Sequence, residues 1–102
     1  MKKRYYLAIA STLLLPLASV VYAAGGDAAA GKEKSTQCAA CHGPNGEGLQ
    51  KNPKIAGMDP KVFAQALEEY KTGKREHPMM QMFAKQLSKE DVTDLAAFYE
   101  KK

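Results

Sequence analysis

Cysteine and histidine are scarce in this chain, and the alternating pattern of β-strands is missing from it. Two of the 102 residues are cysteine and two are histidine. A structural zinc site takes four such ligands, usually in paired spacings, and the distant His77 does not complete such a set. No segment alternates apolar and polar residues, repeats itself or has low complexity. These absences count against a zinc protein and against a thiol–disulfide enzyme, whose C-x-x-C motif lies near a βαβ unit.

Acidic residues are absent from the first 23 positions, which have the three parts of a secretory signal peptide. Residues 2–4 are basic, residues 7–17 are apolar, and Val21-Tyr22-Ala23 ends in a small residue. We predict cleavage after Ala23, which leaves one domain over residues 24–102 in the periplasm. The alternative is an uncleaved anchor, because the apolar stretch approaches the roughly 18 residues that a membrane span needs. No cysteine follows the apolar stretch directly, which excludes a lipoprotein anchor.

A strong net charge is missing once the leader is removed. The whole chain has 15 basic and 11 acidic side chains, a net charge of +4. The leader carries three of the bases and no acid, so 12 bases and 11 acids remain, a net charge of +1. This balance gives no case for nucleic-acid binding. The remaining 79 residues (102 minus 23) are marginal for a self-sufficient hydrophobic core, a shortage that a large bound apolar cofactor would relieve.

Helix boundaries recur along the rest of the chain. The caps Asp27 and Asp59, a proline after the second of them, and the helix-ending Gly73 are typical boundary residues. A sequence like a capping box at residues 88–91 begins the last helix. The predicted helices run from Asp27 to about His42, from Pro60 to Gly73, from Pro78 to about Leu87, and from Ser88 onward. A glycine in mid-helix, Gly31, costs about 1 kcal/mol relative to alanine, so either a close helix crossing compensates for it or it is merely tolerated. We predict a compact all-α domain of about four helices.

The most informative motif is Cys38-Ala39-Ala40-Cys41-His42. On a helix, positions i, i+3 and i+4 share one face, so the two thiols and the imidazole point the same way. Two thiols one turn apart can form thioethers with the two vinyl groups of a haem, and the imidazole just beyond can ligate the iron. A disulfide across the motif would close too short a loop to stabilise the fold much. The spacing C-x-x-C-H therefore predicts one covalently bound haem c, attached through Cys38 and Cys41, with His42 as an axial ligand of the iron.

Methionines that follow this motif are candidates for the second axial ligand. Met80 begins an unbroken apolar stripe at positions i, i+3, i+4 and i+7, whereas the stripe from Met79 ends at a polar residue and that from Met82 faces water. We therefore predict Met80 as the ligand, with Met79 as the runner-up. A thioether ligand raises the reduction potential and is typical of an electron carrier. His77 remains a bis-histidine alternative, and Met58 is expected to be remote in the middle loop.

The order of these motifs resembles that of the small bacterial class I c-type cytochromes. The resemblance spans essentially all of the chain after the leader. Its matching segments are Gly31-Lys32, Cys38 through Gly48, Pro53 through Gly57, Tyr70 through Arg75, Met79-Met80, and Leu87 through Tyr99. It implies a class I cytochrome c fold around one haem, with Met80 as the axial methionine. It also implies that the Pro53 carbonyl accepts a hydrogen bond from the His42 imidazole and thereby fixes its tautomer.

The same resemblance implies further roles. Gly31 matches the glycine at which the first and last helices cross, with Tyr99 or Phe98 as its aromatic partner. Arg75 or Tyr70 is a candidate contact of a haem propionate, with solvated surface and core packing as the alternatives.

Together these residues predict a periplasmic electron carrier rather than an enzyme. With both axial positions of the iron filled no substrate binds there, and electrons pass through an exposed haem edge at a small, transient interface with redox protein partners. After leader cleavage no stable membrane insertion is expected.

The resemblance extends to one domain of two-haem bacterial cytochromes and to the cytochrome subunit of sulfide dehydrogenases. The alternative is therefore a haem c subunit of a redox enzyme, such as a sulfide-oxidising flavoprotein complex. An open-iron enzyme or gas sensor would require the methionine to be absent or displaceable.

Four lysines are candidates to surround the haem edge and to steer acidic partners weakly: Lys51, Lys54, Lys85 and Lys89.

Overall fold

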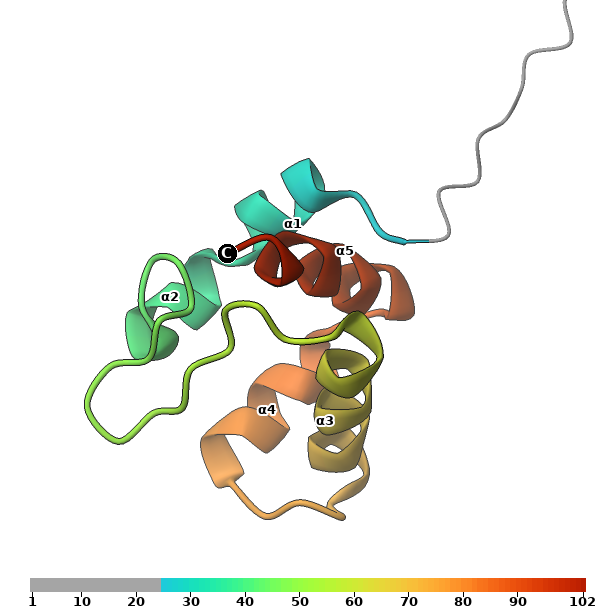
Figure 1. The fold of residues 1–102 in the computed structure, drawn as a ribbon. Helices are drawn as coiled ribbons and strands as arrows, with labels where there is room; N and C mark the ends of the chain where they lie inside the picture. Colours follow the sequence, from blue (N-terminus) through green and yellow to red (C-terminus); the bar gives the residue numbers. More distant parts are fainter. Residues whose placement is uncertain (1–24) are drawn as a thin grey trace, which may run out of the picture.

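Residues 25–102 are described by the structure, a computed structural model. Within this range the chain forms five helices and no strand: α1 (Ala28–Lys34), α2 (Thr36–His42), α3 (Pro60–Thr72), α4 (Pro78–Gln86) and α5 (Lys89–Glu100) (Figure 1). The all-α prediction is confirmed. The predicted leader, residues 1–23, lies outside the described residues. None of these five helices has both the length and the hydropathy to span a membrane.

The single helix predicted between Asp27 and His42 is divided at Ser35, which is why the fold has five helices rather than about four. The predicted cap is confirmed, because the Asp27 carboxylate accepts hydrogen bonds from the amides of Ala29 and Ala30. The Ser35 hydroxyl donates to the Lys32 carbonyl at 2.6 Å. Such a bond from a serine to the preceding turn competes with the helical hydrogen bonds and bends the chain. The buried Ser35 therefore separates α1 from α2.

The other helix ends follow the predicted chemistry. Asp59 caps α3 by accepting from the amides of Lys61 and Val62, and Gly73, with φ of 82°, ends it in the left-handed conformation. At the start of α5 the Ser88 hydroxyl accepts from the Asp91 amide, while the Asp91 carboxylate accepts from the Ser88 amide. This reciprocal pair is the predicted capping box.

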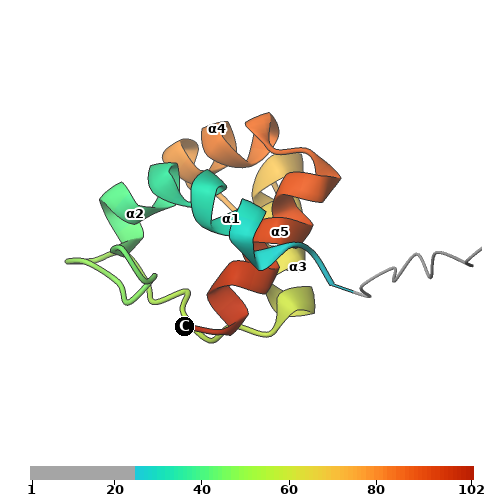
Figure 2. The same cartoon turned by 90° about the horizontal axis from the view of Figure 1, so that it is seen from above.

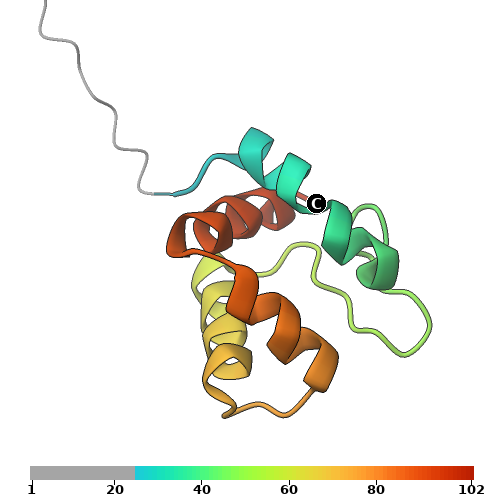
Figure 3. The ribbon, with the colours of Figure 1, turned by 180° about the vertical axis from the view of Figure 1, so that it is seen from behind.

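The helices are arranged around α5. α1 lies across α5, and α3 packs against both α4 and α5 (Figures 1 and 2). Residues 43–59 form a long connection without helix or strand that leads from α2 to α3 (Figure 3). Of the five helices described, α1 is the only one that α2 approaches closely. The helix that carries the C-x-x-C-H motif is thus held by α1 and by the loop that follows it.

The crossing of α1 over α5 is made at Gly31. A side-chain carbon placed there would overlap the Asp94 carbonyl and would come 2.9 Å from Cβ of Phe98. Only glycine allows the two backbones to approach this closely. The aromatic partner is therefore Phe98, and the alternative of a merely tolerated glycine is wrong.

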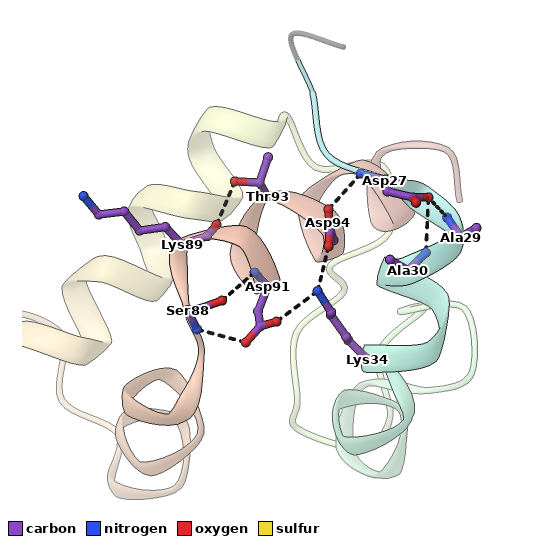
Figure 4. A network of polar contacts seen from close by, with 9 residues as sticks. All are labelled: Asp27, Ala29, Ala30, Lys34, Ser88, Lys89, Asp91, Thr93 and Asp94. Atoms are coloured by element: carbon purple, nitrogen blue, oxygen red, sulfur yellow. Dashed lines mark hydrogen bonds and ion pairs between the residues drawn. The ribbon is translucent and has the colours of Figure 1, made fainter. Parts of the chain in front are cut away.

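A polar network fastens the same crossing (Figure 4). The buried Asp94 accepts hydrogen bonds from the Asp27 amide at 2.8 Å and from the Lys34 ammonium at 2.6 Å. Lys34 also lies 2.9 Å from a carboxylate oxygen of Asp91. The hydrogen bond from Lys34, and then that from the Asp27 amide, holds the pKa of Asp94 below its usual range. Hydrogen bonds to Asp94 and Asp91 raise the pKa of Lys34. No pattern in the sequence predicted this network.

The hydrophobic core lies between α3 and α5 and includes Ala84 of α4. Tyr99 is fully buried, with its ring stacked on Phe63 at 5.7 Å between centroids and edge-on to Phe98 at 4.9 Å. Leu67 and Leu95 are also buried here. A second group of apolar side chains packs against this core but stays partly exposed: Cys38, Ile55, Met58, Tyr70, Met80, Leu87 and Val92. Most of this second group faces the cavity described next.

Candidate functional site

A cavity of about 450 Å³ lies beside the core, a volume within the range of small-molecule and cofactor sites. It is bordered by α2, by the loop that follows α2, by α3 and by α4. Its walls are largely apolar, with contributions from Ile55, Ala66, Leu67, Phe83, Leu87 and Leu95.

The C-x-x-C-H motif forms one wall of the cavity. Cys38, Cys41 and His42 all border it from α2, as expected for side chains at i, i+3 and i+4. No disulfide joins the two cysteines. Cys38 is half-buried, and burial raises the pKa of its thiol, whereas Cys41 is exposed. Both thiols thus reach the same space from consecutive turns of one helix.

The imidazole of His42 is buried and fixed in orientation. Its Nδ1 lies 2.8 Å from the carbonyl oxygen of Pro53. Because a carbonyl can only accept, Nδ1 carries the proton and Nε2 keeps its lone pair. The loop is tied back to α2 by two further bonds, from the Gly48 amide to the His42 carbonyl at 2.7 Å and from the Asn52 side chain to the Cys41 carbonyl at 3.0 Å. The contact that the resemblance implied between His42 and Pro53 is present.

Three methionines border the cavity, and they differ in burial. Met80 is partly buried and packs against the core. Met79 is 51% exposed, and Met82, which does not border the cavity, is 48% exposed. Met58 also forms part of the wall, so the expectation that it is remote is wrong. It was missed because residues 43–59 have no regular structure from which a position in space can be inferred.

The rim of the cavity carries a stack of three side chains from α3 and the turn after it. The Arg75 guanidinium lies over the Tyr70 ring at 5.3 Å, and the His77 ring meets Tyr70 edge-on at 6.4 Å. Two nitrogens of the Arg75 guanidinium also donate to the same carboxylate oxygen of Glu69, Oε2, at 2.9 and 3.1 Å. This contact raises the pKa of Arg75 and lowers that of Glu69. Both candidate propionate contacts, Tyr70 and Arg75, therefore lie at the cavity.

His77 has a local role that the sequence did not reveal. It is exposed, and it is also the N-cap of α4, where its Nδ1 accepts a hydrogen bond from the Met80 amide at 3.2 Å. Histidine is not among the preferred N-cap residues, so no capping pattern marked it. Of the four lysines considered for the haem edge only Lys54 borders the cavity, although Lys51, Lys85 and Lys89 are exposed as well.

The residues around this cavity fit a haem. They supply two thiols one turn apart, an imidazole with a free nitrogen and a thioether, the donors typical of a c-type haem with histidine and methionine ligands. The walls are apolar, as the faces of a porphyrin require. α2 and α4, which carry His42 and Met80, make no close approach to each other, so no helix–helix contact closes the space between these residues.

Comparisons with known proteins agree with this fit. A sequence model of the cytochrome c family matches residues 28–101. Cytochrome c4 of Pseudomonas aeruginosa is 37% identical over 94 residues, which cover 91% of this chain and 46% of the relative. Cytochrome c-554(548) of Halomonas halodenitrificans is 38% identical over 78 residues, which cover 72% of this chain and 94% of the relative. A solved structure of cytochrome c4 from Acidithiobacillus ferrooxidans superposes with a TM-score of 0.71 at 28% identity, over 82% of this chain and 53% of that one. The chain thus spans about half the length of the cytochrome c4 proteins that it matches.

Proposed function

Because this chain belongs to the cytochrome c family, we propose that it is a monohaem electron carrier with His42 and Met80 as the axial ligands of the haem iron. One observation carries the proposal: His42 and Met80 border a single cavity, although the helices that bear them do not approach each other. Haem c, the cofactor of this family, supplies one-electron chemistry at its iron when bound.

The protein's part is to hold both ligands and to keep the site apolar. The hydrogen bond from His42 Nδ1 to Pro53 fixes the ring and leaves Nε2 as the ligating nitrogen. With haem c bound, a thioether ligand from Met80 would favour the reduced state and raise the reduction potential. The apolar walls around His42 and Met80 would raise the potential further, because a low dielectric disfavours the more highly charged oxidised iron.

We assign covalent attachment to Cys38 and Cys41. Their position on one face of α2, at the border of the same cavity as His42, supports this assignment. Haem attachment of this type takes place outside the cytoplasm, so the proposal includes export to the periplasm, a leader over residues 1–23 and a mature domain over residues 24–102. Protein recovered from the periplasm should begin at Ala24, and a chain that keeps its leader in the membrane fraction would contradict this part of the proposal.

With both axial positions filled, the iron offers no site for a substrate, and the partners of the carrier are other redox proteins. The alternative, a haem subunit of a redox enzyme, requires a permanent complex. Stoichiometric co-purification with a flavoprotein would favour that alternative. Ready binding of carbon monoxide to the reduced protein at neutral pH would overturn six-coordinate ligation.

An optical redox titration of three holoproteins tests the ligand assignment. Met80→Leu should lose the far-red band of methionine-to-iron ligation and lower the reduction potential. Met79→Leu is the matched control because Met79 is the adjacent methionine and is half exposed, and it should keep both properties. Loss of the band in Met79→Leu alone would transfer the ligand role to Met79.

A further inference from the structure

α4 begins with an unusual cap. His77 adopts an extended backbone conformation, and its Nδ1 accepts the amide hydrogen of Met80 at 3.2 Å. In return, the His77 amide donates to the side-chain oxygen of Gln81 at 3.3 Å. The pair works like a capping box, with an imidazole nitrogen in place of the usual hydroxyl or carboxylate oxygen. Met80 therefore sits in a turn whose geometry depends on the His77 ring.

The ring itself is held from α3. Tyr70 meets it edge-on at 6.4 Å between centroids, and the Arg75 guanidinium lies over Tyr70 at 5.3 Å. Aromatic pairs and guanidinium–aromatic contacts of this kind each contribute to stability beyond the area they bury. The Glu69 carboxylate then fixes Arg75 through two hydrogen bonds. A small cap such as serine would hold the Met80 amide but would have no ring to place against Tyr70.

The first turn of α4 has little else to hold it. Among the described helices α4 packs only against α3, and Pro78 and Met79, the first two residues of α4, are exposed. The amides of a first helical turn have no partner within the helix, so an uncapped turn frays. Met80 is the third residue of α4 and lies within that turn.

From these contacts we propose that His77 is a positioning residue, which caps α4 and so holds the Met80 thioether at the cavity. This inference rests on the proposed function, because it concerns the residue assigned as the second iron ligand. As a consequence, Met80 has little freedom to move, because the His77 cap and its contact with Tyr70 anchor the start of α4 to α3. Without the cap, Met80 spends more time away from the iron, and a competing ligand binds more tightly in proportion to that time.

The test compares ferric holoproteins of the wild type, His77→Ala, His77→Asn and Met80→Leu, with Glu76→Ala as the matched control. Glu76 is exposed and takes part in none of the hydrogen bonds or ion pairs found among residues 25–102. The readouts are the far-red band and the apparent affinity for added imidazole. His77→Ala should weaken the band and raise the imidazole affinity about fivefold, the factor that corresponds to loss of a typical N-cap. His77→Asn should recover most of the band and of the resistance to imidazole, because asparagine is a strong N-cap even without a ring against Tyr70, and Glu76→Ala should leave both readouts unchanged.

The outcomes separate this inference from the proposed function. Loss of the band in Met80→Leu with wild-type imidazole affinity in His77→Ala would overturn the role of His77 and leave the electron-carrier proposal standing. A band that persists in Met80→Leu would overturn both, because Met80 would then not be the ligand. If His77→Ala does not give a holoprotein, hydrogen exchange at the Met80 amide decides the question. Protection of that amide in the wild type and in His77→Asn supports the inference, and an unprotected amide in the wild type overturns it.

Discussion

The crossing of α1 over α5 and the cavity bordered by α2 and α4 differ in what fills the space between the helices. At the crossing, backbone lies against backbone at Gly31, and Asp94 joins the two segments by hydrogen bonds to Asp27 and Lys34. At the cavity, apolar side chains surround about 450 Å³, and among the helices of residues 25–102 α2 approaches only α1. At the crossing, the protein's own atoms fill the space between the helices, whereas the cavity region depends on a further group for its packing.

This difference follows from the small size of the domain. A chain of this length buries too little apolar surface to stabilise all of its helices by itself. Here the buried core is formed by α3 and α5 together with Ala84 of α4. We infer that haem c serves as the remaining part of the hydrophobic core, and that the two regions therefore respond differently to its loss.

Loss of covalent haem attachment should have the largest effect, and it should destabilise the cavity region more than the crossing of α1 over α5. In the double variant Cys38→Ser, Cys41→Ser, amides of α2 should exchange with solvent at unprotected rates. Amides of α5 should keep measurable protection, because the crossing with α1 needs no cofactor. Hydrogen exchange followed by mass spectrometry measures both regions in one sample. Equal protection of α2 and α5 in that variant would contradict the distinction between the two regions.

A methyl group at the crossing should have the next largest effect. Gly31→Ala places a carbon against the Asp94 carbonyl, so the helices must separate, at a cost of about 1–3 kcal/mol in the free energy of unfolding. The matched control is Gly25→Ala, since no atom lies within 4 Å of a side-chain carbon at Gly25. Denaturant titration of the holoproteins measures the difference. An unchanged free energy of unfolding in Gly31→Ala would show that the crossing is loose.

Removal of the Asp94 charge should have a smaller effect on the same crossing. Asp94→Asn weakens the hydrogen bonds to the Asp27 amide and the Lys34 ammonium and should lower the melting temperature by about 5 °C at pH 7. Glu90→Gln is the control, because Glu90 is an exposed carboxylate on the same helix. Equal melting temperatures for the two variants would mean that the network contributes nothing.

The stability difference between the wild type and Asp94→Asn should depend on pH, because the pKa of Asp94 is lowered in the folded protein. The pKa of Asp94 is lower in the folded protein than in the unfolded chain, so its contribution to stability is present above about pH 4. That contribution is lost as the pH falls through the lowered value. The gap in stability between the wild type and Asp94→Asn should therefore narrow on acidification below about pH 4 and stay constant between pH 5 and 8.

A single charge at the rim of the cavity should have the smallest effect. Lys54 borders the cavity and Lys89 does not, although both are exposed. Lys54→Ala should slow oxidation of the reduced holoprotein by ferricyanide, an anion, by less than about twofold at low ionic strength, while Lys89→Ala should not change the rate. Stopped-flow measurements at low and high salt test this, and a larger effect in Lys89→Ala would place the electron-transfer edge elsewhere.

Local chemistry made much of this molecule predictable from its sequence. The caps at Asp27, Asp59 and Ser88 act within three residues of themselves, so their hydrogen bonds follow from the sequence alone. The C-x-x-C-H motif likewise presents its side chains on one turn of helix, and its three functional groups border one cavity. The resemblance to class I cytochromes added the contact between His42 and Pro53, which spacing by itself does not reveal.

Contacts between segments that lie far apart in the sequence could not be predicted from the sequence. The pairing of Lys34 with Asp94 joins residues 60 positions apart, and neither side chain belongs to a recognisable pattern. The place of Met58 in the cavity wall depends on the path of an irregular loop. At the break, the Ser35 and Thr36 hydroxyls both donate to carbonyls of the preceding turn, and helix propensity alone does not predict these hydrogen bonds.

We infer that one haem c completes this fold between His42 and Met80. A crystal structure of the holoprotein would identify the two atoms that ligate the iron. We predict Nε2 of His42 and the sulfur of Met80, with the haem in the cavity between α2 and α4. Ligation by Met58, Met79 or His77, or a haem bound outside this cavity, would show that Met80 does not complete the site.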